Sequence, residues 1–352
     1  METVTVAASR VYPVHIGGGL LDRCGELTAA ATAAGRCLVV SDDTVAPLYG
    51  ARVLASLEAA GLQASLYTFP AGEQSKNLTT YGKLLEHMAR EKLTRSDCVA
   101  ALGGGVTGDM AGFAAATYQR GIDYIQIPTT FLAAADSSVG GKTAVDLEAG
   151  KNLVGAFWQP RAVICDTGTF RTLPEDTFLD GVAETVKHGL IADAGFFRFL
   201  LAADLRGDID RIVRRDVEIK AAVVGEDEFE RGRRKILNFG HTLGHAMEKL
   251  SGYATPHGHA VAVGMVLAAR GAERLGYSPA GTLATVLAAN ERLGLPSRCP
   301  YGAQALYEAA TGDKKRGGDH IDVVVLEEIG RAGTVRLDMA GLRAFTEAAV
   351  WI

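Results

Sequence analysis

The chain has 352 residues, which is long for a single hydrophobic core and predicts two domains. Its hydrophobic fraction of 48% and charged fraction of 22% are typical of a globular protein, and its net charge of -5 gives no support for nucleic-acid binding, which usually leaves a basic surface. The five cysteines are scattered without a C-x-x-C pair, which argues against a disulfide framework and a cysteine zinc site.

The first residues lack the basic and apolar regions of a signal peptide, and the apolar runs along the chain are too short to span a bilayer. We therefore expect a cytoplasmic protein that does not bind membranes. Up to about residue 170, short β-rich runs alternate with helical stretches, a pattern that predicts a mostly parallel sheet covered on both faces. The expected strands are 3–7, 37–41, 65–69, 98–102, 124–128 and 162–166, and two of the expected helices are 54–60 and 81–91.

After residue 170 the sequence becomes predominantly helical, with one late strand expected at 321–326. We therefore divide the chain into an α/β domain at 1–170 and an α-helical domain at 171–352. The expected helices of the second domain are 178–191, 209–226, 237–250, 259–275 and 280–293.

The segment from Gly103 to Pro160 is rich in glycine and reads as nucleotide- and phosphate-binding loops. Its first glycines follow an apolar run at 99–102, where a strand is expected to end. A backbone without side chains can approach a pyrophosphate there, and the amide groups of the next helix face the anion. The GGGVTGD sequence is not the G-x-G-x-x-G fingerprint, so it supports nucleotide binding in general and no more.

Histidines in the second half point to a metal. His241 and His245 are spaced i, i+4, which puts them on one helix face, and His257 and His259 follow after a short loop. Upstream, Glu184 interrupts an apolar helix. One carboxylate with two or more imidazoles is typical of a catalytic zinc site, although the spacing does not say which histidines bind.

Basic side chains in otherwise apolar or glycine-rich segments indicate an anionic substrate. Lys142 and Lys151 follow glycines, and Lys187 interrupts the apolar helix that carries Glu184. A small phosphorylated and carboxylated molecule is the natural candidate.

A set of longer motifs runs in order over nearly the whole chain: PAGEQSK, GGGVTGDMAGFAAATYQRG, PTTFLAAADSSVGGKTAVD, GKNLVGAFWQPRAVICDT, GVAETVKHGLI, RKILNFGHTLGHAMEK, HGHAVAVGM and DKKR. In these motifs the chain resembles the 3-dehydroquinate synthases, which are sugar-phosphate cyclases. The resemblance implies an N-terminal Rossmann-like NAD domain, a C-terminal α-helical metal-binding domain and an active site in the cleft between them.

The resemblance also assigns the cofactors. It implies that Zn²⁺ or Co²⁺ is held by Glu184, His241 and His257, so that His245 faces the substrate phosphate instead of the metal. The residues that it places along NAD are Glu73, Lys76, Gly104, Gly105, Val106, Thr107, Gly108, Asp109, Thr129, Thr130, Lys142, Lys151, Thr169, Phe170, Arg171 and Thr172.

The implied substrate is 3-deoxy-D-arabino-heptulosonate 7-phosphate, and a homodimer is implied in which Arg120 reaches the partner's substrate phosphate. The implied reaction is a transient oxidation by NAD, phosphate elimination, re-reduction, ring opening and intramolecular aldol closure. The residues implied to contact substrate are Arg120, Asp136, Lys142, Asn152, Lys187, Lys220, Arg234, Asn238, His245 and one of Lys314 and Lys315.

One position departs from the family pattern: His259 stands where an acidic residue usually follows His-Gly. The three implied metal ligands remain, and the SSVGGKT stretch favours a dehydroquinate synthase over the cyclases that make valiolone or inosose rings. The sequence leaves two alternative functions open. One is a metal-dependent alcohol dehydrogenase, which would release NADH, and the other is a non-catalytic binding protein.

Overall fold

The computed structural model describes residues 1–312 and 320–350, and these form two compact units. The first unit comprises 1–173 and 209–229, and the second comprises 174–208 and 230–352. The change expected near residue 170 falls close to the junction at Leu173, but the segment Ile209–Phe229 groups with the first unit.

The first unit is built on a seven-stranded sheet in the order β1-β2-β9-β6-β5-β3-β4. The β1–β2 pair is antiparallel, and all the other pairs are parallel, as expected. β5 and β9 are buried throughout, which explains why they appear in the sequence as continuous apolar runs. The strands are β1 (Glu2–Ala7), β2 (Val11–Gly17), β3 (Arg36–Asp42), β4 (Gln63–Phe69), β5 (Cys98–Gly103), β6 (Asp123–Pro128) and β9 (Ala162–Asp166).

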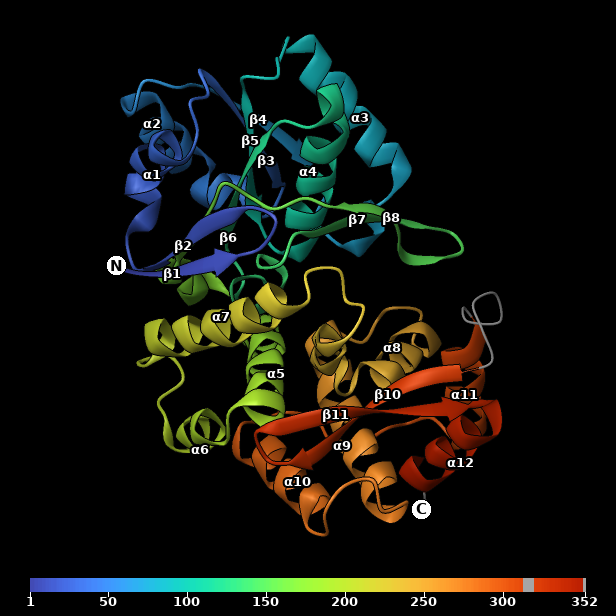
Figure 1. The fold of residues 1–352 in the computed structure, drawn as a ribbon. Coiled ribbons are helices and arrows are strands. Elements are labelled where there is room, and N and C mark those ends of the chain that lie inside the picture. The colour runs from blue at the N-terminus through green and yellow to red at the C-terminus, as the bar shows by residue number, and fades with distance from the viewer. Residues whose placement is uncertain (313–319, 351–352) are drawn as a thin grey trace. The chain divides into compact units, whose positions relative to one another are not determined.

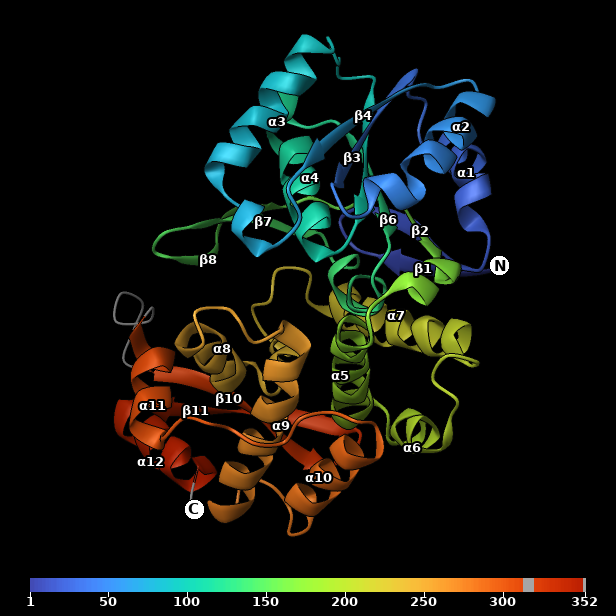
Figure 2. The same cartoon turned by 180° about the vertical axis from the view of Figure 1, so that it is seen from behind.

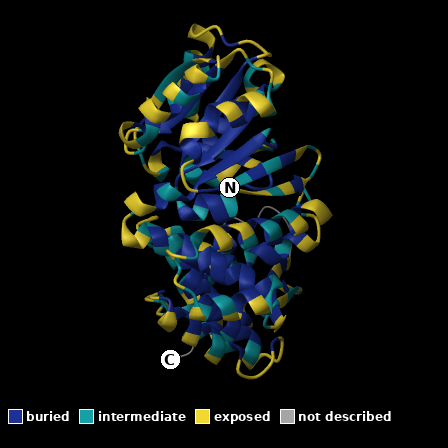
Figure 3. Ribbon diagram, turned by 90° about the vertical axis from the view of Figure 1, so that its left-hand side faces the viewer, coloured by how far each residue is buried: buried dark blue, intermediate teal, exposed yellow. Residues whose placement is uncertain are grey.

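Helices cover both faces of this sheet (Figures 1 and 2). Alternate residues of each strand point to opposite sides, so each face contributes to a separate core. Val39 packs with the core beneath α1 and α2, and Val40 packs with the core beneath α3 and α4. The strands β3, β5 and β9 are nearly or fully buried, as the dark colour of the sheet interior shows (Figure 3). The helices are η1 (Leu20–Arg23), α1 (Cys24–Ala31), η2 (Ala46–Gly50), α2 (Ala51–Ala59), η3 (Glu73–Ser75), α3 (Leu78–Arg90), α4 (Gly105–Thr117), η4 (Tyr118–Arg120), η5 (Ala133–Ser137), η6 (Thr167–Thr172) and α7 (Ile209–Glu226).

A separate hairpin, formed by β7 (Lys142–Leu147) and β8 (Gly150–Phe157), corrects the sequence interpretation of this region. The segments read there as phosphate-binding loops are largely paired strands. Thr143, Ala144 and Val145 of β7 are buried, and Val145 joins the core beneath α3 and α4. The buried run at 143–145 therefore packs against α4 as part of a strand.

The second unit is mostly helical and also contains an antiparallel hairpin. The strand expected at 321–326 is present within β10, and the sequence interpretation missed its partner β11. Apolar residues of α8, α9, α11, α12 and the hairpin share one core. The elements are α5 (Glu175–Ala192), α6 (Ala194–Ala202), η7 (Arg233–Asn238), α8 (His241–Leu250), α9 (His257–Arg274), α10 (Thr282–Arg292), α11 (Ala303–Gly312), β10 (His320–Glu328), β11 (Arg331–Asp338) and α12 (Met339–Val350).

The helix expected at 237–250 is interrupted, because η7 ends at Asn238 and α8 begins at His241. Gly240 between them has a φ of 81°, a left-handed conformation that favours glycine. This break starts α8 at the first histidine of the motif. Among the described residues, no helix is both long enough and apolar enough to cross a membrane.

Candidate active site

The site in the second unit begins with a buried ion pair on α5. Glu184 and Lys187 are both fully buried, and the Lys187 ammonium contacts the Glu184 carboxylate across one turn. Isolated charges are too costly to bury in an apolar helix, so each stabilises the other. The i, i+3 spacing of the two residues brings them into contact, and the pair leaves a carboxylate fixed in the interior.

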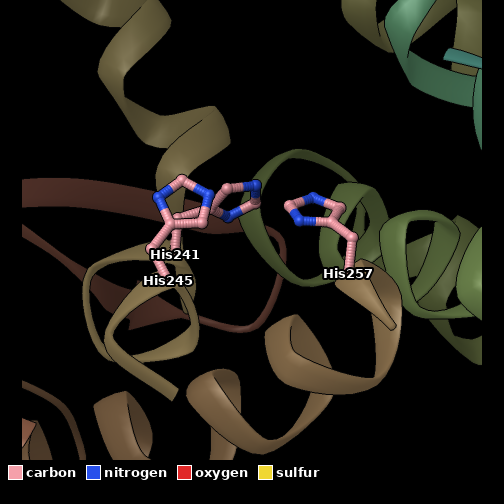
Figure 4. Close-up of side chains that lie close together, drawn as sticks. All are labelled: His241, His245 and His257. Carbon is pink, nitrogen blue, oxygen red and sulfur yellow. The ribbon is translucent and has the colours of Figure 1, made fainter. Parts of the chain in front are cut away.

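Two helices bring histidines to this carboxylate. His241 and His245 lie on one face of α8, with ring centroids 5.1 Å apart, and His257 is the first residue of α9. Figure 4 shows the three imidazole rings gathered together. The helices approach closely through glycine: a Cβ at Gly264 would lie 2.0 Å from the carbonyl oxygen of Gly240. No side chain fits there, so small residues set the separation of the histidines.

The donor atoms are spaced as metal ligands. Oε1 of Glu184 lies 3.5 Å from Nε2 of His241 and 3.2 Å from Nε2 of His257. Two ligands at a tetrahedral zinc ion, with bonds of about 2.0–2.1 Å, are separated by about 3.3 Å. The ring nitrogens of His241, His245 and His257 also fall within 4.8 Å of one another. The residues present thus fit a divalent metal.

The second ring nitrogens of His241 and His257 are also engaged. Nδ1 of His241 donates to the backbone carbonyl of Phe239 at 3.2 Å, and Nδ1 of His257 lies 3.4 Å from Oε1 of Glu248. Carbonyl and carboxylate oxygens accept, so each ring carries a proton on Nδ1, and Nε2 is the nitrogen left to bind a metal. Sequence reasoning missed Glu248, although its i+3 spacing from His245 was a usable signal.

The electrostatics of the two rings differ. Burial, with a smaller effect from Lys187, holds the pKa of His241 well below its usual range, so this imidazole is neutral. Burial by itself lowers the pKa of His257, but Glu184 and Glu248 outweigh it and raise the pKa to about 10. The two carboxylates therefore favour positive charge at the position that a cation would occupy.

Other predicted substrate contacts belong to η7 and α8 of the same unit. Arg234 is buried, and Asn238 donates from Nδ2 to Oε1 of Glu230 at 2.7 Å. His245 has a side chain that is 57% exposed and lies 3.8 Å from Glu248. Lys314 and Lys315 fall outside the described residues.

In the first unit, the expected nucleotide loop lies between β5 and α4. Gly104 caps α4, and a Cβ on it would lie 3.2 Å from the Thr130 side chain. The hydroxyl of Thr129 is buried and has no hydrogen-bond partner among the described residues. An open helix N-terminus beside a buried hydroxyl fits a dinucleotide phosphate. Four further residues expected at NAD lie on the first turns of α4: Gly105, Val106, Thr107 and Gly108.

Lys76 joins Asp109, which the resemblance also places along NAD, to Asn152, which it places at the substrate. Its ammonium nitrogen lies 2.6 Å from Oδ2 of Asp109 and 2.6 Å from Oδ1 of Asn152. Burial raises the pKa of Asp109, whereas at Lys76 the nearby carboxylates outweigh burial and raise the pKa of the ammonium. Nearby, Lys151 pairs with Glu73 at 3.1 Å.

A second ion pair of the first unit joins Lys220 of α7 to Asp136 of η5, at 2.7 Å. Lys220 therefore belongs structurally with the α/β unit, contrary to its sequence assignment to 171–352. Lys142 is exposed at the start of β7, paired in register with Phe157. Arg120 is exposed, with a φ of 66°.

The turn at 169–172, expected near NAD, forms η6 and is organised by Asp166. This carboxylate accepts hydrogen bonds from the backbone amides of Gly19, Leu21 and Gly168, at 2.9, 2.9 and 3.0 Å. Thr169 and Phe170 are buried, and Arg171 and Thr172 are exposed. Sequence reasoning read Asp166 only as the end of a strand.

Comparison with known proteins identifies the family of the chain. Residues 66–180 match the N-terminal and residues 181–316 the C-terminal region of 3-dehydroquinate synthase. A 3-dehydroquinate synthase from Enterococcus faecalis is 43% identical over 98% of each chain.

Solved structures share the fold of this chain. A 2-deoxy-scyllo-inosose synthase, complexed with carbaglucose-6-phosphate, NAD⁺ and Co²⁺, has a TM-score of 0.89 at 26% identity, over 98% of this chain and 99% of that one. A 2-epi-5-epi-valiolone synthase from Streptomyces hygroscopicus, with NAD⁺ and Zn²⁺, has a TM-score of 0.87 at 27% identity, over 98% of each chain. The family matches over both regions, with the full-length relative, show that the chain belongs to the 3-dehydroquinate synthase family.

Proposed function

We propose that this chain converts 3-deoxy-D-arabino-heptulosonate 7-phosphate to 3-dehydroquinate and phosphate, as a carbon–oxygen lyase that uses NAD and a divalent metal. The observation that carries the proposal is the convergence of Glu184, His241 and His257 in a chain that is 43% identical to a 3-dehydroquinate synthase. The two solved cyclases are only 26% and 27% identical, which favours dehydroquinate over an inosose or valiolone as product.

Glu184, His241 and His257 would hold the metal, as Zn²⁺ or Co²⁺. A bound divalent cation lowers the pKa of hydroxyls that it coordinates and polarises the attached oxygens. The outer hydrogen bonds to Phe239 and Glu248 keep both rings oriented for this task. Lys187 holds the remaining oxygen of Glu184, so the carboxylate keeps one orientation when the site binds substrate.

The open N-terminus of α4 and the buried hydroxyl of Thr129 would bind the NAD phosphates. NAD held there would supply a hydride acceptor that is regenerated within one turnover, so no reduced cofactor would accumulate. Lys76, held against Asp109, keeps a positive charge beside the nucleotide loop. The other residues proposed to contact NAD are Glu73, Gly104, Gly105, Val106, Thr107, Gly108, Asp109, Thr130, Lys142, Lys151, Thr169, Phe170, Arg171 and Thr172.

Basic and amide side chains would bind the anionic ends of the substrate. We propose that Lys142, Asn152 and His245 orient the phosphate and that Arg234 and Lys220 hold the carboxylate. Because phosphate leaves by β-elimination with its own oxygen as base, the protein needs few general bases and chiefly orients charge. Asp136, Lys187 and Asn238 complete the set, and Arg120 would reach the partner's phosphate in a cytoplasmic homodimer.

The test is phosphate release from heptulosonate 7-phosphate by the purified chain, with and without added NAD⁺ and after chelation. We expect release that requires metal, no net NADH and 3-dehydroquinate as the product. No release from metal-loaded, NAD-loaded protein would contradict the proposal. NADH accumulating with simple alcohols would indicate a dehydrogenase instead.

A further inference from the structure

The first turn of α9 carries the proposed metal ligand His257, and the N-terminal end of α9 is capped from another helix. Pro256 precedes the turn and offers no side-chain hydrogen bond to it. The first amide groups of a helix have no partners inside the helix. The backbone amide of His259 instead donates to Oδ1 of Asp180 on α5, at 3.0 Å. Asp180 therefore performs the task of an N-cap residue from outside the helix.

The same carboxylate oxygen makes a second contact with the same residue. Nδ1 of His259 lies 2.8 Å from Oδ1 of Asp180, and both side chains are largely buried. One oxygen thus holds both the backbone and the ring of His259, which restrains the turn in rotation as well as in distance. His259, the position that departs from the family pattern, is thus held against α5 by this contact.

The two backbones touch at the residue between His257 and His259. A Cβ at Gly258 would lie 2.3 Å from both Cα and the carbonyl oxygen of Asp180. Only a glycine fits at such a separation. A change in the position of Asp180 is therefore transmitted directly to the first turn of α9.

Two carboxylates on α5 face the first turn of α9. Asp180 and Glu184 are spaced i, i+4 and so share one face of α5. The first holds His259, and the second faces His257 with Oε1 and Nε2 3.2 Å apart. We propose that Asp180 is a positioning residue for the metal site: by capping α9, it sets the distance between His257 and Glu184. This inference rests on the proposed metal site.

The experiment uses the full-length chain and titrates it with Co²⁺ and Zn²⁺, reading affinity by chelator competition and Co²⁺ geometry by visible absorption. Asp180→Ala removes both contacts, so we expect about tenfold or greater loss of affinity, in the range seen when a partner of a metal ligand is lost, and a shifted Co²⁺ spectrum. Asp180→Asn retains an oxygen acceptor for the amide and should recover most of the affinity. His259→Ala removes only the ring contact and should bind nearly as the parent does.

Asp176→Ala is the matched control, because Asp176 is an exposed carboxylate one turn earlier on the same helix. If Asp180→Ala bound Co²⁺ with the affinity and spectrum of Asp176→Ala, the inference would be overturned. If Asp180→Ala failed to fold, Asp180→Asn would decide, because a neutral amide oxygen is a weaker acceptor than a carboxylate: affinity below that of Asp176→Ala with a shifted Co²⁺ spectrum would support the inference, and the affinity and spectrum of Asp176→Ala would overturn it. Failure of the parent chain itself to bind metal would instead contradict the proposed function, and a parent that binds no better than His257→Ala would do the same.

Discussion

The ammonium nitrogen of Lys76 lies 2.6 Å from the amide oxygen of Asn152, although they belong to different segments of the first unit. Asn152 is in β8 with a φ of 57°, a conformation that non-glycine residues seldom adopt, and its backbone amide donates to Oδ1 of Asp146 at 2.8 Å. The amide of Asp146 in turn donates to the carbonyl of Lys76. These three hydrogen bonds close a ring that joins a residue assigned to NAD with one assigned to substrate.

Replacing Lys76 with methionine should destabilise the chain by about 3 kcal/mol, because it leaves the Asp109 carboxylate without its ammonium partner. Urea unfolding measures the change. Lys83→Met on the exposed side of α3 is the control and should change stability by less than about 0.5 kcal/mol. Equal effects of the two substitutions would contradict the structural role assigned to Lys76.

Glu248→Gln should weaken metal binding by about tenfold to a hundredfold, because the neutral amide orients His257 less strongly than a carboxylate does. Titration against a competing chelator measures the affinity. Glu291→Gln, on the exposed surface of α10, should leave it unchanged. A Glu248→Gln protein with parental affinity would show that the Nδ1 contact does not support the site.

Asp166→Ala should destabilise the first unit by about 3 kcal/mol, because three backbone amides lose their shared acceptor. Chemical unfolding tests this, with Glu58→Ala on the exposed side of α2 as the control. Asp166→Ala should also bind NAD⁺ more weakly, because Asp166 organises the turn at 169–172. Undiminished stability would mean that water replaces the carboxylate at all three amides.

The buried thiol of Cys24 should make stability fall at alkaline pH. Burial raises its pKa from 9.0 to about 11, so the folded chain retains a proton that the unfolded chain releases. Its contribution is therefore complete below pH 9 and is lost as the pH rises from 9 through 11, by about 3 kcal/mol. Unfolding of the parent and of Cys24→Ala at several pH values measures the difference. Parallel curves for the two proteins would contradict the expected shift.

Elements whose burial is uniform were predictable from the sequence. β3, β5 and β9 are nearly or fully buried, so hydrophobicity alone marks them, and α5 and α9 show helical periodicity around apolar cores. β8 and β11 were missed because most of their residues are exposed or half-buried, so neither shows a clear apolar signal. Such strands form through pairing with a partner, which a local pattern does not describe.

For the site, the sequence by itself determined the chemical types: a carboxylate in an apolar helix, two histidines one turn apart on α8, and glycines before α4. Tertiary structure decided which of them meet. Glu184, His241 and His257 converge because α5, α8 and α9 pack at backbone contact through Gly240, Gly258 and Gly264. Helix periodicity specifies the face on which a side chain lies, whereas the separation of two helices depends on how closely distant residues allow their backbones to approach.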